Sequence, residues 1–221
     1  MNQVKLKQEN YSFGGVDYRI CSLLDRNQYD VNDFEARQLG ISSATWPLFG
    51  LVWPTSQVLV NRVIPEIRAG RRILEIGCGI GLASIVLHRM GADITASDYH
   101  PQVLPFLERN LRQNKLSPIK FQTGNWETDN PALGEFDLII GSDILYQPAH
   151  IDDVSQFISR HSSADVDVMI IDPGRENRPR FTRAMRALGY NYRFEKFDEP
   201  VHGKQRCHGW ALHYHRHFPA A

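Results

Sequence analysis

Apolar residues in this chain follow two patterns: short continuous runs, and longer stretches that repeat every three or four positions. A continuous run is typical of a strand buried on both faces, and the longer repeat is typical of a helix with one buried side. Runs of the first kind predict strands at residues 73–76, 136–141 and 166–171, and the segments 92–97 and 120–123 are expected to form two further strands. The second kind predicts helices at residues 82–90, 102–114, 149–160 and 177–188.

The alternation of strands and helices indicates βαβ units. We therefore predict an α/β fold in three layers, with a Rossmann-like, mostly parallel sheet between two layers of helices. Two further strands, at residues 191–198 and 209–216, have no helix between them and are expected to form an antiparallel C-terminal edge. Ligands of such sheets bind at the carboxyl ends of the strands, so polar residues just after each strand are the candidates for function.

Residues 1–45 are expected to be an N-terminal extension that packs on a domain formed by residues 46–221, because 45 residues cannot bury a core alone. Within the extension, Gly14 and Gly15 predict the turn of a hairpin over residues 11–24. Asn32 and Glu35 have the spacing of a capping box and predict a short helix that ends near Gly40.

An aromatic segment follows the extension. Trp46 and Trp53 are each followed by proline, and Thr55 or Ser56 is expected to cap a helix that runs to about Ile64. The two tryptophans form either a lid on the core or a wall of a cofactor site, and the residues alone favour neither. We include Trp53 among the candidate cofactor-binding residues.

Composition limits the classes of function. The chain has 221 residues, 42% of them hydrophobic and 23% charged, with a formal net charge of zero. A balanced charge disfavours a nucleic acid as partner, and no apolar run is long enough for a membrane span. Three widely spaced cysteines disfavour a disulfide framework or a zinc site, and a cytoplasmic location is expected.

The candidate chemistry begins with Glu75, Gly77, Gly79 and Gly81, where a predicted strand passes into a helix. The dinucleotide fingerprint needs a glycine at the position of Leu82, so a dinucleotide is disfavoured. A carboxylate beside the turn would repel a pyrophosphate and attract an ammonium group. This favours a cationic, phosphate-free cofactor such as S-adenosylmethionine, and the alternative is a turn that only lets a helix pack closely.

Further candidates follow the next two strands. Asp98 is placed to accept the hydroxyls of a ribose, or else caps the next helix; Tyr99 beside it is a second candidate for cofactor binding. Asn125 and Trp126 are candidates for hydrogen bonding and stacking on an adenine, with a half-buried surface tryptophan as the alternative.

The fourth strand ends in a polar loop. Ser142, Asp143 and Tyr146 lie where a group leaving the cofactor would arrive. Asp143 is the candidate for holding a substrate amine, and Tyr146 for lining the pocket or donating a hydrogen bond. The alternative is a loop whose aspartate bonds only to backbone amides.

Taken in this order, these motifs resemble those of the class I, seven-strand S-adenosylmethionine-dependent methyltransferases. Three of them are similar to the protein lysine methyltransferase branch: Trp53 with its neighbours, Asp143 with Tyr146, and the segment 172–175, which resembles that of the lysine methyltransferases of the electron-transfer-flavoprotein beta subunit. The resemblance implies that Trp53 and Trp126 line the cofactor and that Asp143 faces the methyl-transfer site. No proline follows Asp143, which makes planar amines less suitable acceptors.

The resemblance implies transfer of a methyl group from S-adenosylmethionine to an amine, with a protein lysine as the expected acceptor. A small-molecule N- or O-methyltransferase is the first alternative, and a cofactor-binding module without turnover is the second. His213, His215 and His217 alternate as on one face of a strand, but we expect no metal site because this family needs none.

Overall fold

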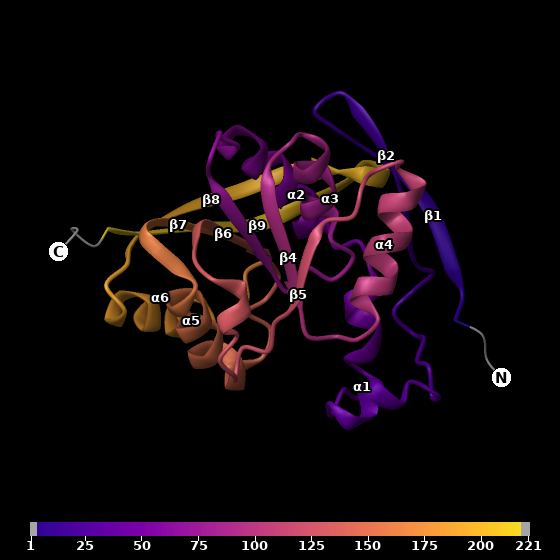
Figure 1. Cartoon of the computed structure of the whole chain (residues 1–221), viewed down its shortest axis with the longest axis horizontal. Helices are drawn as coiled ribbons and strands as arrows, with labels where there is room; N and C mark the ends of the chain where they lie inside the picture. Colours follow the sequence, from indigo (N-terminus) through magenta and orange to yellow (C-terminus); the bar gives the residue numbers. More distant parts are fainter. Residues whose placement is uncertain (1–3, 218–221) are drawn as a thin grey trace.

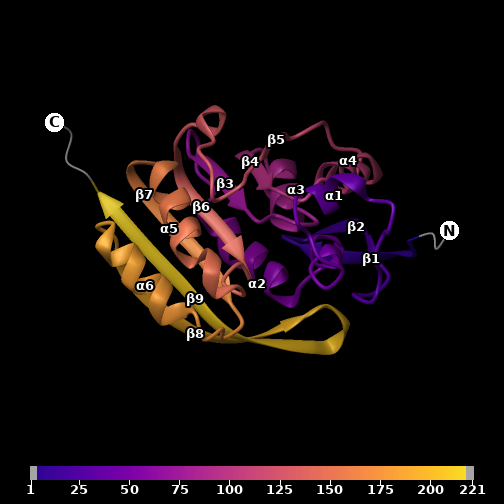
Figure 2. The same cartoon turned by 90° about the horizontal axis from the view of Figure 1, so that it is seen from below.

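The computed structural model describes residues 4–217. Within them, seven strands form one sheet in the order β5, β4, β3, β6, β7, β9, β8 (Figures 1 and 2). In that order the strands span Lys120–Thr123, Asp93–Asp98, Arg72–Ile76, Phe136–Ser142, Ser162–Asp172, Gln205–His217 and Asn191–Val201.

The sheet is parallel from β5 to β7, and β9 is antiparallel to both β7 and β8. The predicted fold class, a mostly parallel sheet with an antiparallel C-terminal edge, is confirmed. The antiparallel strand itself is β9, which lies between β7 and β8, so that β8 forms the outer edge. A hairpin connection places β9 beside β8, and the other edge of β9 pairs with β7 over eight residues, Asp165 to Asp172.

Five helices cover the two faces of the sheet within the described residues. α2, α3 and α4 pack on one face and span Pro54–Val63, Leu82–Arg89 and Val103–Gln113. α5 and α6 pack on the other face and span Ile151–Arg160 and Arg178–Ala187 (Figure 2). Successive side chains of a strand point to opposite faces, and accordingly Ile73 belongs to the first cluster while Leu74 belongs to the second. No helix of residues 4–217 is long and apolar enough to cross a membrane.

The N-terminal segment forms a hairpin of β1 (Leu6–Phe13) and β2 (Val16–Leu23), which lies along α4 (Figure 1). Gly14 and Gly15 form its turn with positive φ angles, as predicted. Two asparagines of α4 bond to the backbone of β2: Asn110 to the N–H and carbonyl of Cys21, and Asn114 to those of Arg19. These four hydrogen bonds satisfy backbone N–H and carbonyl groups of β2 on the edge that does not pair with β1.

Two predicted helix caps are wrong. α1 (Phe34–Gln38) is capped by Asp33, whose carboxylate accepts the N–H of Ala36 at 2.9 Å, and not by Asn32. α2 begins at Pro54, which needs no hydrogen bond for its missing N–H, and no side chain caps it. Ser56, a predicted cap, instead donates its hydroxyl to the carbonyl of Trp53 at 2.7 Å.

Candidate active site

The glycine turn connects β3 to α3. Gly77, Gly79 and Gly81 have φ angles of 58°, 50° and 72°, in the left-handed region that side chains disfavour. A Cβ at Gly79 would stand 2.8 Å from the carbonyl oxygen of Phe49. Phe49 belongs to η1 (Trp46–Gly50), a short 3-10 helix, so the aromatic segment directly supports the turn.

Two other glycines of the turn are also closely packed. A Cβ at Gly77 would stand 3.0 Å from Ile144, in the loop after β6, and 3.4 Å from Trp126. A Cβ at Gly81 would stand 2.7 Å from Leu107 of α4. Close helix packing, the alternative explanation of the turn, therefore accounts for Gly81. Helix packing does not account for Gly77, because the neighbours of a Cβ there would be Ile144 and Trp126, in the loops at the carboxyl ends of the strands.

Glu75 lies beneath the turn, with 3% of its surface exposed. Its carboxylate accepts the backbone N–H of Ser84 at 2.8 Å and the hydroxyl of the same residue at 2.5 Å, and so caps the first turn of α3. Burial raises the pKa of Glu75 to about 7, against the opposing effect of the Ser84 bonds. The sequence interpretation gave Glu75 only a role toward the cofactor, and the structure adds this anchoring role.

Asp98 ends β4 and holds the turn from its side. One carboxylate oxygen accepts the N–H of Gly79 at 2.9 Å, and the other accepts the N–H of His100 at 2.9 Å. The predicted alternative, a direct cap on α4, is wrong, because α4 begins after Gln102 with no side-chain cap. Burial raises the pKa of Asp98, and the charge of Asp98 acts on Glu75 in the same direction.

The two tryptophans of the aromatic segment have different environments. Trp46 is buried, donates its indole N–H to Asp33 at 2.9 Å and packs edge-on against Phe49. Trp46 is therefore a core residue. Trp53 is half-buried and donates its indole N–H to the carbonyl of Leu48 at 3.0 Å. Trp53 remains the candidate of the pair for contact with a cofactor.

The loop after β5 brings Trp126 to the glycine turn, as its contact distance to Gly77 shows. Asn125 uses its side-chain oxygen for the N–H of Glu127 at 3.0 Å, a turn within its own loop.

Asp143 has an unusual backbone and a defined partner. Its φ angle is 53°, rare for a residue with a side chain, and its N–H donates to the carbonyl of Ile171 at 2.8 Å. Arg175 donates to both of its carboxylate oxygens, from Nε and from Nη2, each at 2.8 Å. The loop alternative, an aspartate bonded only to backbone amides, is therefore wrong.

The sequence analysis missed the role of Arg175. It used residues 172–175 for the resemblance but assigned Arg175 no contact. The available signal was its position just after β7, because β7 pairs with β6 and their carboxyl ends meet at one edge. Asp172 holds this loop: its Oδ2 accepts the N–H groups of Gly174 and Arg175, each at 3.0 Å.

Two tyrosines complete the cluster. Tyr146 is 37% exposed, and burial of its hydroxyl raises its pKa to about 12, with smaller effects in the same direction from Tyr99, Asp98 and Asp143. The charge of Asp98 acts on Tyr146 from the end of β4, and that of Asp143 acts on it from the loop after β6. Ser142, the last residue of β6, pairs with Ile171 and is half-buried.

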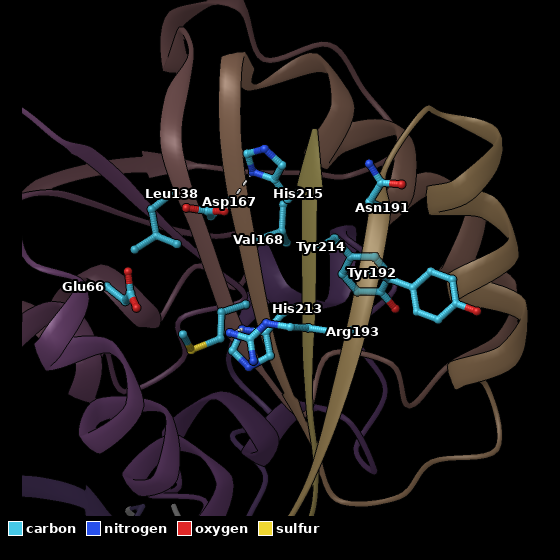
Figure 3. A pocket seen from close by; sticks show the side chains of 11 residues that line it. Glu66, Leu138, Asp167, Val168, Asn191, Tyr192, Arg193, His213, Tyr214 and His215 are labelled. Atoms are coloured by element: carbon cyan, nitrogen blue, oxygen red, sulfur yellow. Dashed lines mark hydrogen bonds and ion pairs between the residues drawn. The ribbon is translucent and has the colours of Figure 1, made fainter. Parts of the chain in front are cut away.

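The alternating histidines lie elsewhere, near the amino ends of the parallel strands (Figure 3). His215 lies 3.0 Å from Asp167, and His217 lies 3.5 Å from Asp165. His213 instead contacts Arg193 at 3.4 Å. Among the described residues, no three histidine, cysteine or carboxylate side chains are arranged to hold a metal ion.

Comparisons with known proteins agree with this geometry. The sequence model of a family described as lysine methyltransferase matches residues 44–186. The electron transfer flavoprotein beta subunit lysine methyltransferase of Danio rerio is 32% identical over 136 residues, 58% of this chain and 51% of that protein. The calmodulin-lysine N-methyltransferase of Arabidopsis thaliana is 27% identical over 192 residues, 79% of this chain and 62% of that protein.

A solved structure shows the same fold. The magnesium protoporphyrin IX methyltransferase of Synechocystis, crystallised with S-adenosylmethionine, aligns with a TM-score of 0.58 at 14% identity, over 86% of this chain and 88% of that one. The chain spans about half the length of the first curated relative named above, and the family match covers most of the α/β domain. This chain belongs to the lysine methyltransferase family, within the class I S-adenosylmethionine-dependent methyltransferases.

Proposed function

We propose that this protein transfers a methyl group from S-adenosylmethionine to the side-chain amine of a protein lysine. The observation that carries the proposal is the contact between the glycine turn and the loop after β6. Ile144 of that loop lies 3.0 Å from the Cβ position of Gly77, so Asp143 and Tyr146 stand beside the turn. Both the cofactor candidates and the amine-binding candidates thus belong to one site.

The charges at the turn suit a cation. The pKa of the Cys78 thiol, within the turn, is raised well above its usual value by burial and further by the charges of Asp98 and Glu75. Asp98, together with Glu75 in its ionised form, places negative charge where a dinucleotide enzyme would bind pyrophosphate. When bound, S-adenosylmethionine supplies an electrophilic methyl group on a positively charged sulfur. The residues proposed to hold it are Trp53, Glu75, Gly77, Gly79, Gly81, Asp98, Tyr99, Asn125, Trp126 and Ser142.

Asp143 is proposed to orient the acceptor amine. Arg175 donates to both of its oxygens, which shows that this carboxylate accepts N–H donors, and a substrate amine would be held there in the same way. Holding an amine in line with the methyl group lowers the entropic cost of the reaction, which is the main contribution available to such a site. The amine loses its proton, to water or to a neighbouring group, before transfer.

Tyr146 is proposed to close the site over the amine. With its pKa raised to about 12, its hydroxyl stays protonated at neutral pH and can donate a hydrogen bond. Its exposed edge faces the solvent through which a substrate lysine arrives.

A transfer experiment tests the proposal. The purified protein is incubated with methyl-labelled cofactor and a cell extract, and the label is followed in proteins and in the soluble pool. Label on a lysine of a protein band is the expected result. Label confined to the soluble pool would support a small-molecule methyltransferase, and no label would support a binding module without turnover.

A further inference from the structure

The strongest unexplained feature of the site is the ion pair between Arg175 and Asp143. It is bidentate, with both N···O distances at 2.8 Å, and the side chain of Asp143 is only 10% exposed while that of Arg175 is 41% exposed. The arginine therefore lies on the solvent side of the pair, between the carboxylate and an arriving substrate. Charge-assisted bidentate pairs of this kind are strong and geometrically specific.

This pair limits how an amine can reach Asp143. Arg175 bonds to both oxygens of the carboxylate, and an amine that approaches from the side held by the guanidinium displaces at least one of these two bonds. The displaced guanidinium remains fully charged, because arginine does not lose its proton in proteins. It then pairs with another anion or is left to water alone.

Asp172 is, besides Asp143, the carboxylate whose charge acts on Arg175. Asp172 is fully buried, its Oδ2 already accepts two backbone N–H groups, and its Oδ1 is enclosed away from solvent. Burial also raises the pKa of Asp172, which reduces its value as a counter-ion. A substrate carboxylate beside the lysine is an anion that can then receive Arg175.

The surface beside Arg175 is also basic. A groove of about 320 Å³ lies between α6 and β8. It is lined by Arg178, Pro179, Thr182, Arg183, Arg186, Tyr192 and Phe194. Arg178, at its start, acts on Asp172 and so connects the groove to the loop that carries Arg175. A partner with acidic residues near its lysine would meet complementary charge here.

We propose that Arg175 is a specificity-determining residue that selects lysines with a carboxylate beside them. On binding, Arg175 leaves Asp143 for the substrate carboxylate, and the lysine amine takes its place at Asp143. Every charge keeps a partner in this exchange, whereas a lysine with neutral neighbours leaves Arg175 unpaired. The inference rests on the proposed function and adds the class of substrate, an acidic segment of a protein.

The test uses the full chain with proteins of a cell extract as acceptors. Methylated lysines are mapped by mass spectrometry, and the best acceptor is then made with the neighbouring Asp or Glu changed to its amide. With the wild-type enzyme this change should lower kcat/KM about 10-fold, the effect expected of one charge-assisted hydrogen bond. With Arg175→Gln the same change should matter less than about 2-fold.

Two further variants complete the design. Arg175→Lys keeps the charge and should retain part of the preference, about 3-fold, which also guards against a misfolded Arg175→Gln. Arg180→Gln is the matched control, because Arg180 lies on α6 and pairs with Asp152 instead. It should keep the full preference of the wild type.

Three results would overturn the inference. One is a set of methylated lysines without acidic neighbours. Another is an equal loss with wild type and Arg175→Gln, which would place recognition of the carboxylate elsewhere. The third is binding of S-adenosylhomocysteine weakened more than about 3-fold in Arg175→Gln, which would make Arg175 a cofactor ligand. Absence of any methylated lysine is a separate outcome, because it would contradict the proposed function and the inference with it.

Discussion

Two charged clusters stand at opposite ends of the same strands. At the carboxyl ends, Asp143 and Arg175 form a bidentate pair beside the glycine turn. Toward the amino ends, Asp167 contacts His215 and also pairs with Arg71. Asp167 and His215 line a hollow of about 290 Å³, together with Tyr192, His213 and others (Figure 3). Both clusters hold arginine, carboxylate and aromatic groups.

They differ in backbone and burial. The first cluster contains residues with positive φ, Gly77, Gly79, Gly81 and Asp143, and enclosed carboxylates whose pKa is raised. In the second, the carboxylates Asp165 and Asp167 are half or more exposed and paired with side chains of the neighbouring strand. The comparison teaches that a hollow with charged walls is weak evidence of a site. Strained backbone and buried, unbalanced charge at strand ends are stronger evidence.

Asp143→Ala should show the largest difference between the two ends. Loss of the group that orients the amine should lower kcat/KM about 1,000-fold, while binding of S-adenosylhomocysteine changes less than about 3-fold. Calorimetry and transfer of labelled methyl groups measure the two effects. The control at the other end, His215→Ala, should keep activity within about 2-fold; full activity in Asp143→Ala would remove Asp143 from the site.

Glu75→Gln should change how stability depends on pH. The pKa of Glu75 is raised in the folded state from 4.5 to about 7, so its protonated form stabilises the fold fully below about pH 4.5. That contribution is lost as pH rises toward 7. Glutamine does not titrate, so the unfolding free energy of the variant minus that of the wild type should rise by roughly 3 kcal/mol between pH 4.5 and about 8. Urea denaturation across this range measures it, and a constant difference would contradict the raised pKa.

Gly79→Ala should cost stability and cofactor binding together. Alanine at this position would have a disfavoured φ, and its Cβ would stand 2.8 Å from the carbonyl oxygen of Phe49. Together these should lower the unfolding free energy by about 2 kcal/mol or more. Gly203→Ala is the control, because its φ is 78° but no atom lies within 4 Å of the added Cβ. It should cost about 1 kcal/mol and leave cofactor binding unchanged. Equal effects of the two changes on cofactor binding would show that Gly79 matters only for strain.

Asp165→Asn should have the smallest effect. Asp165 is 68% exposed and pairs with His215 and His217 at 3.6 and 3.5 Å. Exposed ion pairs contribute little, so the unfolding free energy should fall by less than about 0.5 kcal/mol, with no change in methyl transfer. A measurable loss of transfer would show that the amino-end cluster takes part in function.

The sequence predicted the sheet well because β3, β6 and β7 contain apolar runs and helices separate the parallel strands. Every predicted core strand is present, and β5 has the predicted bounds, Lys120–Thr123. β8 and β9 extend further than predicted, to Val201 and from Gln205, because polar and charged residues fill an exposed edge strand as readily as a loop. The caps of α1 and α2 were wrong because Asp33 and Pro54, neighbours of the predicted residues, serve the same purpose.

The site could be predicted in part. The glycine turn, Asp98 and Asp143 could be proposed as site residues because each lies in a short motif directly after a predicted strand. The partner of Asp143 could not be predicted, because Arg175 lies 32 residues away and meets it only through the pairing of β6 and β7. The capping role of Glu75 was equally hidden, because it depends on how α3 packs over β3.

The central claim is that the cofactor binds at the carboxyl ends of the strands and not in the hollow at the other end. Amide hydrogen exchange with and without S-adenosylhomocysteine tests this most directly. We expect new protection at residues 77–81, 98–100, 125–127 and 143–146, and none around His213 and His215. Protection centred on residues 191–193 and 213–215, with the glycine turn unchanged, would contradict the account.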